Sequence, residues 1–548
     1  MRRPLIAALS ATVLATAGLA GCGAGAGQAA AAKDTLVVMA DSAASYQRNF
    51  NPFSTAVNAG ARGLIYEPLT IYTPMKPDQA TPWLATSSQW SDGGHKLTID
   101  IRTGVRWSDG KPFSSKDVAF TFDLLRKNPA LNITNVTDTS ATAPDAKTVV
   151  LSFDQPGYAQ TLKIGAITPV PEHVYTGKDP MTFTDPNPIG TGPYTLDTFS
   201  PQVYTYKANP TYWQAGKISV KKIQFPTVSA NSFDSLLGQG RLDWSGGFVA
   251  HVDQIFVNKD KAHNQYWYPA DGLVNLVSNL KRAPLDSVPV RKAISTAIDR
   301  AALSKVAALG YETAASPTGL VRPAYDSYLD PQYKDLQFKT DAAAANTLLD
   351  KAGLRKGADG IRVGPGGKKL AFTLLVPSGF SDWVTMARLI QSQLKGVGIE
   401  VDPQGKSTQA WKAALKTGNY DMAIAGSVGG SSPYDLYRPF LSSKLTAPIG
   451  QQALSNYSRW SDPATDGYLS TFDQTEDATQ LRNAVYGLEK VMVEQLPVIP
   501  LLGSANWSQT RTTKFTGWPS ATDPYALPAP YQFPDNLLVI THLKRATG

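Results

Sequence analysis

The chain contains 548 residues, carries a formal net charge of +8 and has one cysteine, Cys22. A single cysteine excludes an internal disulfide, a CxxC redox pair and a thiolate metal cluster. The basic residues are scattered along the sequence, which argues against nucleic-acid binding and indicates only mild attraction to an anionic envelope.

The first predicted element is an export signal at residues 1–21. Two arginines precede an apolar stretch at 5–18, and the run LAGC ends at Cys22. A basic start, an apolar centre and small residues at the cut are typical of secretory signals, and LAGC resembles the lipobox of bacterial lipoproteins. Acylation of Cys22 after cleavage would hold the protein at the outer face of the membrane. An ordinary signal peptide and a transmembrane anchor are the alternatives.

A flexible tether is predicted at residues 22–33. The sequence GAGAGQAAAA at 23–32 has no large apolar side chain to bury, so it gives the segment little reason to fold. No later apolar run is long enough to span a bilayer.

From Asp34 onward, strand-like and helix-like segments alternate without a detectable internal repeat. Strands are predicted at 36–39, 97–101, 148–153, 222–225, 372–376, 399–401 and 422–425. Helices are predicted after the capping-box pattern at 114–117, around 290–298, at 386–394, and at 481–496 before Pro497. This alternation predicts an α/β fold with long loops.

No catalytic motif stands out. The five histidines lie far apart and none belongs to an HExxH pair, which argues against a zinc hydrolase. Gly367-Lys368 lacks the upstream glycine of a phosphate loop, because Arg362 occupies that position. The run AGSVG at 425–429 lacks the first glycine of a nucleophile elbow, so a glycine-rich loop after a strand is the simpler interpretation. We therefore expect no enzyme activity, metal or cofactor, although a glycosidase carboxylate pair stays open as an alternative.

Several phrases point to one family. Residues 97–125 read LTIDIRTGVRWSDGKPFSSKDVAFTFDLL, which resembles the signature region of the family 5 extracytoplasmic solute-binding proteins of bacterial ABC importers. Further landmarks of that family follow in order: PIGTGPYTL at 188–196, NPTYW at 209–213, GRLD at 240–243, VRKAISTAIDR at 290–300 and LLDKAG at 348–353. Together they extend over nearly all of the chain after the tether.

The resemblance implies a two-lobed α/β clamp of the periplasmic-binding-protein type with an enlarged N-terminal lobe. Lobe I is expected at 34–283, with an extra subdomain near 80–200, lobe II at 284–503, and a return to lobe I at 504–548. The chain would cross the hinge near 280–286 and again near 500–506. Ligand held between the lobes would favour a closed monomer that a membrane permease recognises, while separate subunits hydrolyse ATP.

The ligand class implied by the resemblance is an oligosaccharide or a short peptide. Peptide-binding members place an acidic residue in the second lobe to pair with the free ammonium, whereas residues 421–437 offer mainly glycine and serine, with Asp435 the nearest acid. NFNPFS at 49–54, YEPL at 66–69, PWLA at 82–85 and FTGWPSATDPY at 515–525 look more like the oligosaccharide-binding branch. Sugar faces stack on aromatic rings, so we favour an oligosaccharide.

Aromatic and amide side chains are the expected ligand contacts, because flat rings and neutral amides suit sugars. The candidates are Tyr46, Asn49, Trp244, Trp383, Trp411, Tyr434 and Trp507. Two other roles stay open: an exported lipid-anchored glycosidase, and a surface sensor or adhesion protein that passes its ligand to another protein.

Overall fold

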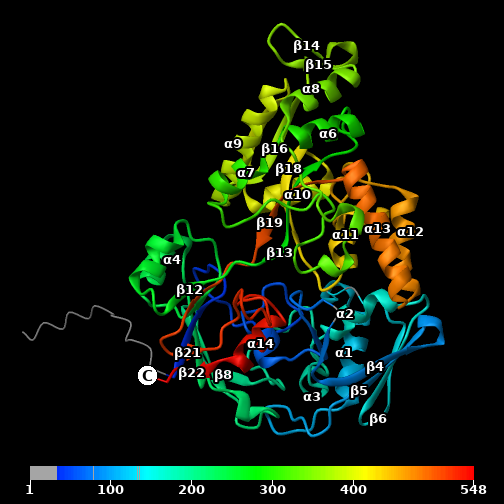
Figure 1. The fold of residues 1–548 in the computed structure, drawn as a ribbon. Coiled ribbons are helices and arrows are strands. Elements are labelled where there is room, and N and C mark those ends of the chain that lie inside the picture. Colours follow the sequence, from blue (N-terminus) through cyan, green and yellow to red (C-terminus); the bar gives the residue numbers. More distant parts are fainter. Residues whose placement is uncertain (1–33, 78, 133, 135, 548) are drawn as a thin grey trace, which may run out of the picture.

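A computed structural model of the chain describes residues 34–77, 79–132, 134 and 136–547. The predicted signal peptide, Cys22 and the tether lie outside these residues. Figure 1 shows a large lobe, which holds a seven-stranded and a four-stranded sheet, below a smaller lobe built on a five-stranded sheet. In the part of the chain that the structure describes, no helix is both long and apolar enough to cross a membrane.

The seven-stranded sheet of the large lobe joins segments from both ends of the chain. Its order is β12 (Asn264–Tyr266), β20 (Gln509–Arg511), β11 (Trp244–Ser245), β1 (Thr35–Met39), β10 (Lys222–Pro226), β9 (Val203–Ala208) and β8 (Tyr194–Ser200). Strand β1 runs parallel to β10 and β11. The sheet packs with α14 (Asp535–His542), α4 (Ala230–Gly238), α5 (Val252–Ile255) and the short pair β21 (Phe515–Thr516) and β22 (Lys544–Arg545).

The four-stranded sheet forms the outer part of the large lobe. Its order is β4 (Ala85–Ser91), β5 (Lys96–Ile101), β7 (Thr148–Ser152) and β6 (Ser140–Asp145), covered by α1 (Ser115–Lys127). The predicted capping box is present, with Ser114 and Asp117 bonding each other's backbone N–H groups. A hairpin of β2 (Thr70–Tyr72) and β3 (Ala80–Pro82) and two short helices, α2 (Thr161–Gly165) and α3 (Glu172–Tyr175), complete this region.

The five-stranded sheet of the small lobe has the order β17 (Glu400–Lys406), β16 (Ala371–Pro377), β18 (Met422–Val428), β13 (Ala270–Ser278) and β19 (Ile499–Ala505). Strand β16 is parallel to both β17 and β18, whereas β13 is antiparallel to its neighbours. Its helices are α6 (Val288–Ala297), α7 (Arg300–Ala302), α8 (Ala342–Lys351), α9 (Ser381–Gly396), α10 (Thr408–Thr417), α11 (Pro433–Leu441), α12 (Pro463–Gln474) and α13 (Ala478–Gln495), with a short hairpin of β14 (Arg355–Lys356) and β15 (Arg362–Val363).

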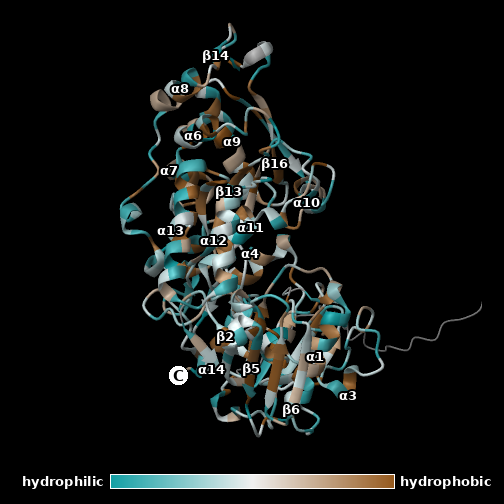
Figure 2. Ribbon diagram, turned by 90° about the vertical axis from the view of Figure 1, so that its right-hand side faces the viewer, coloured by the Kyte–Doolittle hydropathy of each residue, from teal (hydrophilic) through white to brown (hydrophobic). Residues whose placement is uncertain are grey.

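Hydrophobic residues concentrate on the strands, while the outer helices α12 and α13 are mixed in hydropathy (Figure 2). Each lobe has its own buried core, one centred on the five-stranded sheet and one on the sheets of the large lobe. Every strand and helix predicted above coincides with an observed element, namely β1, β5, β7, β10, β16, β17 and β18, and helices α1, α6, α9 and α13. The alternation of apolar and polar residues therefore predicted these elements correctly.

The chain changes lobes at two neighbouring connections. It leaves the large lobe between β12 and β13 and returns between β19 and β20. The connections are joined because the Asn506 N–H donates to Pro269 O at 2.8 Å and the Asn506 side-chain amide to Asp271 Oδ2 at 2.7 Å. The first crossing therefore lies at 267–269, upstream of the 280–286 expected from the sequence. Gly272 and the buried Asn275 interrupt the apolar pattern of β13, which hid this strand.

Candidate functional site

Three cavities form a row, and the second and third of them lie between the two lobes. The first, about 580 Å³, lies along the large lobe and is lined by residues of 40–47, 55–62 and 530–536. The second, about 280 Å³, lies between large-lobe residues and the small-lobe segment 429–431. The third, about 120 Å³, lies between α2 and helices α11 and α12. Phe533 lines the first and second cavities and Lys163 the second and third, so we call the row the interlobe cleft.

The small-lobe wall of the cleft follows the carboxyl end of β18. In open α/β sheets, ligands bind in the crevice outside the carboxyl ends of parallel strands. A side chain on Gly429 would place its Cβ 1.8 Å from Asp271 O, and one on Gly430 would meet the Asp435 Cβ at 2.1 Å. Positions 429 and 430 of the predicted glycine-rich loop therefore require glycine, because a side chain at either position would overlap a neighbouring residue.

The large-lobe wall combines an N-terminal loop with the segment before α14. Tyr46 packs edge-on against Tyr204, with ring centroids 4.8 Å apart, and its hydroxyl donates to Pro226 O at 3.0 Å. Burial, with a smaller contribution from Asp41, raises the pKa of Tyr46 to about 12. Tyr531 also lines the first cavity and is 43% exposed, so part of this residue is accessible.

Charged side chains from both lobes meet where the second and third cavities join. Lys163 on α2 faces Asp435 and Arg438 of α11 and Asp473 of α12. Burial raises the pKa of Asp435, whereas Ser432, Lys163 and Arg438 act to lower it. Beside this group, the Ser431 hydroxyl of the small lobe donates to Tyr72 O of the large lobe at 3.1 Å. The lobes therefore touch on this side of the cleft, where α12 also reaches the large lobe (Figure 1).

Three buried carboxyl groups, those of Asp271, Glu312 and Asp535, have raised pKa values. Burial raises the pKa of Asp271 to about 6, that of Asp535 to about 7 and that of Glu312 to about 8. Glu312 Oε1 accepts the Ala505 N–H at 3.1 Å, while its Oε2 has no hydrogen-bond partner among the described residues. Of these three carboxyl groups, Asp535 lines the second cavity.

Two predicted contacts, Tyr46 and Tyr434, line the interlobe cleft. Asn49 is half-buried in the adjacent loop, where its amide donates to Ser54 Oγ at 2.9 Å, and it lines none of the three cavities. Ligand contact by these residues stays a prediction.

The four predicted tryptophans lie outside the lining of the three cavities. Trp244 is 1% exposed and donates from its indole to Pro528 O at 2.7 Å, so it belongs to the large-lobe core, which corrects its interpretation as an accessible contact. Trp383 and Trp411 pack together, with centroids 6.1 Å apart, and each is 9% exposed. Trp507 is half-buried in an aromatic cluster with Phe248 and Tyr268.

Four residues that line the cleft were not predicted from the sequence, namely Lys163, Tyr531, Phe533 and Asp535. Tyr531 to Asp535 lie a few residues after FTGWPSATDPY at 515–525. The two aromatic residues in the run YQFPD were the signal in the sequence that could have pointed to this part of the cleft. Lys163 sits on a five-residue helix without a distinguishing pattern.

Two of the phrases that resemble the oligosaccharide-binding branch, YEPL and PWLA, build scaffold. They meet the family landmark NPTYW at Glu67, which is completely buried. Its Oε1 accepts from the Trp83 indole at 2.5 Å, the Tyr212 hydroxyl at 2.8 Å and the Trp213 indole at 3.2 Å. Burial raises the pKa of Glu67 to about 7 in spite of these donors. YEPL and PWLA therefore indicate the architecture of the large lobe and not ligand contacts.

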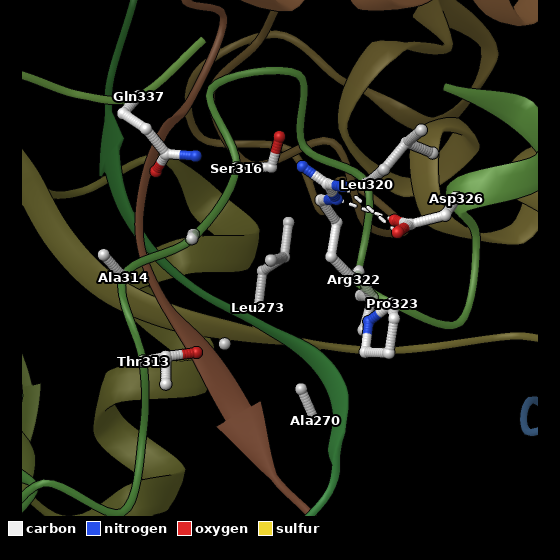
Figure 3. A pocket seen from close by; sticks show the side chains of 13 residues that line it. Ala270, Leu273, Thr313, Ala314, Ser316, Leu320, Arg322, Pro323, Asp326 and Gln337 are labelled. Atoms are coloured by element: carbon white, nitrogen blue, oxygen red, sulfur yellow. Dashed lines mark hydrogen bonds and ion pairs between the residues drawn. The ribbon is translucent and has the colours of Figure 1, made fainter. Parts of the chain in front are cut away.

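A fourth cavity, about 340 Å³, lies in the small lobe beside the crossing strands (Figure 3). Ala270 and Leu273 of β13 and Gly503 of β19 line it together with the segments 313–316 and 320–323. Arg322 and Asp326 form an ion pair at 2.7 Å at its edge. It shares no lining residue with the interlobe cleft.

Comparison with known families gives one match. Residues 79–447 match the profile of the bacterial extracellular solute-binding proteins, family 5. Among curated relatives, Protein XP55 of Streptomyces lividans is 29% identical over 415 residues, which cover 74% of this chain and 72% of the relative. The periplasmic murein peptide-binding protein MppA of Escherichia coli K12 is 26% identical over 457 residues, which cover 78% of this chain and 80% of the relative.

Solved structures agree with this match. A periplasmic oligopeptide-binding protein of an ABC transporter from Thermotoga maritima superposes with a TM-score of 0.86 at 25% identity, covering 94% of this chain and 99% of that one. The same Thermotoga protein bound to mannohexaose superposes with a TM-score of 0.79 over the same shares. These matches confirm the predicted α/β fold with two lobes.

Proposed function

Because the chain belongs to the family 5 bacterial extracellular solute-binding proteins, we propose that it captures an oligosaccharide between its lobes and delivers it to the permease of an ABC importer. Members of this family are extracytoplasmic binding proteins, and the relative MppA is named for binding a murein peptide. Ligand that touches both lobes stabilises the closed form, because only that form makes both sets of contacts.

The lining of the interlobe cleft carries the choice of an oligosaccharide. Aromatic rings occur along the whole row of cavities, at Tyr46, Tyr531, Phe533, Tyr72 and Tyr434. Neutral amides and hydroxyls lie between them. The flat apolar faces of a sugar can stack on the rings, and its hydroxyl groups can form hydrogen bonds with the amides and hydroxyls. The mannohexaose complex of the Thermotoga protein supports the same ligand class.

A short peptide is the second candidate. The murein peptide-binding relative MppA favours it, and Asp435 supplies an acid in the cleft. However, Lys163, Arg438 and the Ser432 hydroxyl already stabilise the charge of Asp435. A peptide ammonium would compete with these groups, which is why we place the peptide second.

A thermal-shift panel separates the two ligand classes. Bound ligand raises the melting temperature by mass action, so cello-, xylo- and malto-oligosaccharides are compared with di- to pentapeptides. A shift with oligosaccharides supports the proposal. Shifts with peptides alone would reverse the order of the two candidates.

Replacing Phe533 with alanine is expected to weaken ligand binding about 10- to 100-fold, because buried aromatic contacts dominate such interfaces. Phe533 lines both the first and the second cavity, so its loss affects a ligand that extends through either. Phe120→Ala is a matched control, since Phe120 is also half-buried but lies on α1 outside the cleft. Isothermal titration with the best ligand of the panel measures both, and equal losses in the two variants would contradict the prediction.

We also propose that Cys22 carries the lipid anchor, that the connections β12–β13 and β19–β20 form the hinge, and that the protein acts as a monomer. The basic start, apolar centre and LAGC run support the anchor. Cys22→Ser is expected to abolish labelling with radioactive palmitate and to shift the protein from the membrane fraction to the soluble fraction. Membrane retention of this variant would point to another anchor.

A further inference from the structure

Asp535 combines complete burial with an unused hydrogen-bond acceptor. It is 0% exposed at the start of α14, yet it lines the second cavity of the interlobe cleft. The Leu527 N–H at 2.8 Å and the Thr73 hydroxyl both donate to Oδ1. Among the described residues, Oδ2 has no hydrogen-bond partner.

An unpaired buried carboxylate oxygen is costly for the folded protein. Buried polar groups are nearly always hydrogen-bonded. A buried group without a hydrogen bond has lost its contact with water and has gained nothing in exchange, which lowers the stability of the folded protein. The two hydrogen bonds to Oδ1 hold the start of α14 against Thr73 and Leu527 of the large lobe. No hydrogen bond among the described residues uses the second oxygen, and Asp535 is one of the residues that line the second cavity.

We propose that Asp535 Oδ2 is a ligand-binding acceptor, which takes a hydrogen bond from a hydroxyl group of an oligosaccharide bound in the second cavity. The inference rests on the proposed function. Thr70, Ser431 and Gln532 line the same cavity, so neutral donors and acceptors surround the carboxylate. A sugar hydroxyl can donate to Oδ2 and accept from one of these neighbours at the same time.

Asp535→Asn tests the role of this one oxygen. The amide keeps an oxygen at the position of Oδ1 for Leu527 and Thr73, but replaces Oδ2 with an NH₂ group that cannot accept. The dissociation constant for the best oligosaccharide of the panel is expected to rise about 10- to 100-fold. The melting temperature without ligand is expected to equal or exceed that of the unmodified protein, because a neutral amide is easier to bury than a carboxylate.

Asp185→Asn is the matched control. Asp185 is 1% exposed, and its Oδ2 accepts from the hydroxyls of Tyr66 and Tyr175 in the large-lobe core. It lines none of the cleft cavities. The change should therefore leave ligand affinity unchanged.

The pH dependence of binding gives a second readout. Burial raises the pKa of Asp535 to about 7. A hydroxyl donor prefers the ionised carboxylate, so lowering the pH from 8 to 6 should shrink the affinity ratio between the unmodified protein and Asp535→Asn. Lys163 and Asp435 line the same cavity and Asp271 lies on β13, but these three groups are present in both proteins and cancel in the ratio.

The outcomes separate this inference from the proposed function. If oligosaccharides bind the unmodified protein and Asp535→Asn equally well, the inference alone is overturned. The same holds if Asp185→Asn loses as much affinity, because the loss would then be general. If only peptides bind, or if no probe of the panel binds, both the proposed function and the assignment of a sugar hydroxyl are overturned.

Discussion

Replacing Arg291 with methionine is expected to lower the free energy of unfolding by about 3–5 kcal/mol. Arg291 lies on α6 and is 2% exposed. Its guanidinium donates to Gln495 O at 2.7 Å and Leu496 O at 2.9 Å, at the end of α13, and to Leu285 O and Asp286 O before α6. Methionine has similar length but no donor, so these carbonyl groups would lose their partner in the small-lobe core.

Denaturant titration followed by circular dichroism measures this loss. Lys292→Met is the control, because Lys292 is the next residue on α6 and is half-buried without a comparable set of bonds. Surface substitutions of this kind usually change stability by less than about 0.5 kcal/mol. Equal stability of the two variants would show that the guanidinium bonds of Arg291 contribute little.

The second large effect is a loss of stability as the pH rises from about 5 to 8. Burial raises the pKa of Glu67 to about 7, that of Glu312 to about 8 and that of Glu489 to about 8. An unfolded chain releases these protons near pH 4 to 5, whereas the folded protein keeps them up to about pH 7 or 8. Unfolding therefore releases protons across this window, and the free energy of unfolding falls as the pH rises.

Because one unit of pKa shift corresponds to about 1.4 kcal/mol, several such groups together should lower the free energy of unfolding by several kcal/mol. The melting temperature is expected to be at least about 5 °C higher at pH 5.5 than at pH 8.5. Glu312→Gln should reduce this difference and be more stable than the unmodified protein at pH 8.5. A steeper or unchanged pH dependence in this variant would contradict the explanation.

The sequence predicted local structure well where a pattern is confined to one element. Strand β5 alternates in burial, and the capping box before α1 consists of residues three positions apart. Arg291 and Arg300 of the VRKAISTAIDR phrase could be recognised as a family landmark, but their task was visible only in the structure. Arg300 donates to Pro500 O at 2.8 Å, which ties α7 to β19 across 200 residues.

The lining of the cleft could be predicted only in part because tertiary packing decides which aromatic residues stay accessible. Trp244 follows the GRLD turn and looked accessible, but it packs against Trp518 at 5.5 Å and its indole is fully bonded. Phe533 and Asp535 reach the cleft because the segment before α14 folds back over the large lobe. No local periodicity records such a return of the chain.

The return of the C-terminal segment to the large lobe also sets an order for folding. Strand β20 lies between β12 and β11, the Asp535 carboxyl meets Thr73, and Arg545 pairs with Asp34. A chain delivered from its N-terminus onward cannot complete this sheet until β20 has emerged, and it cannot make the contacts of Asp535 and Arg545 until its last residues arrive. The small lobe already has all of its strands once β19 has emerged. Contacts so distant in sequence form slowly, so the large lobe is the part that a chaperone must protect from aggregation during synthesis.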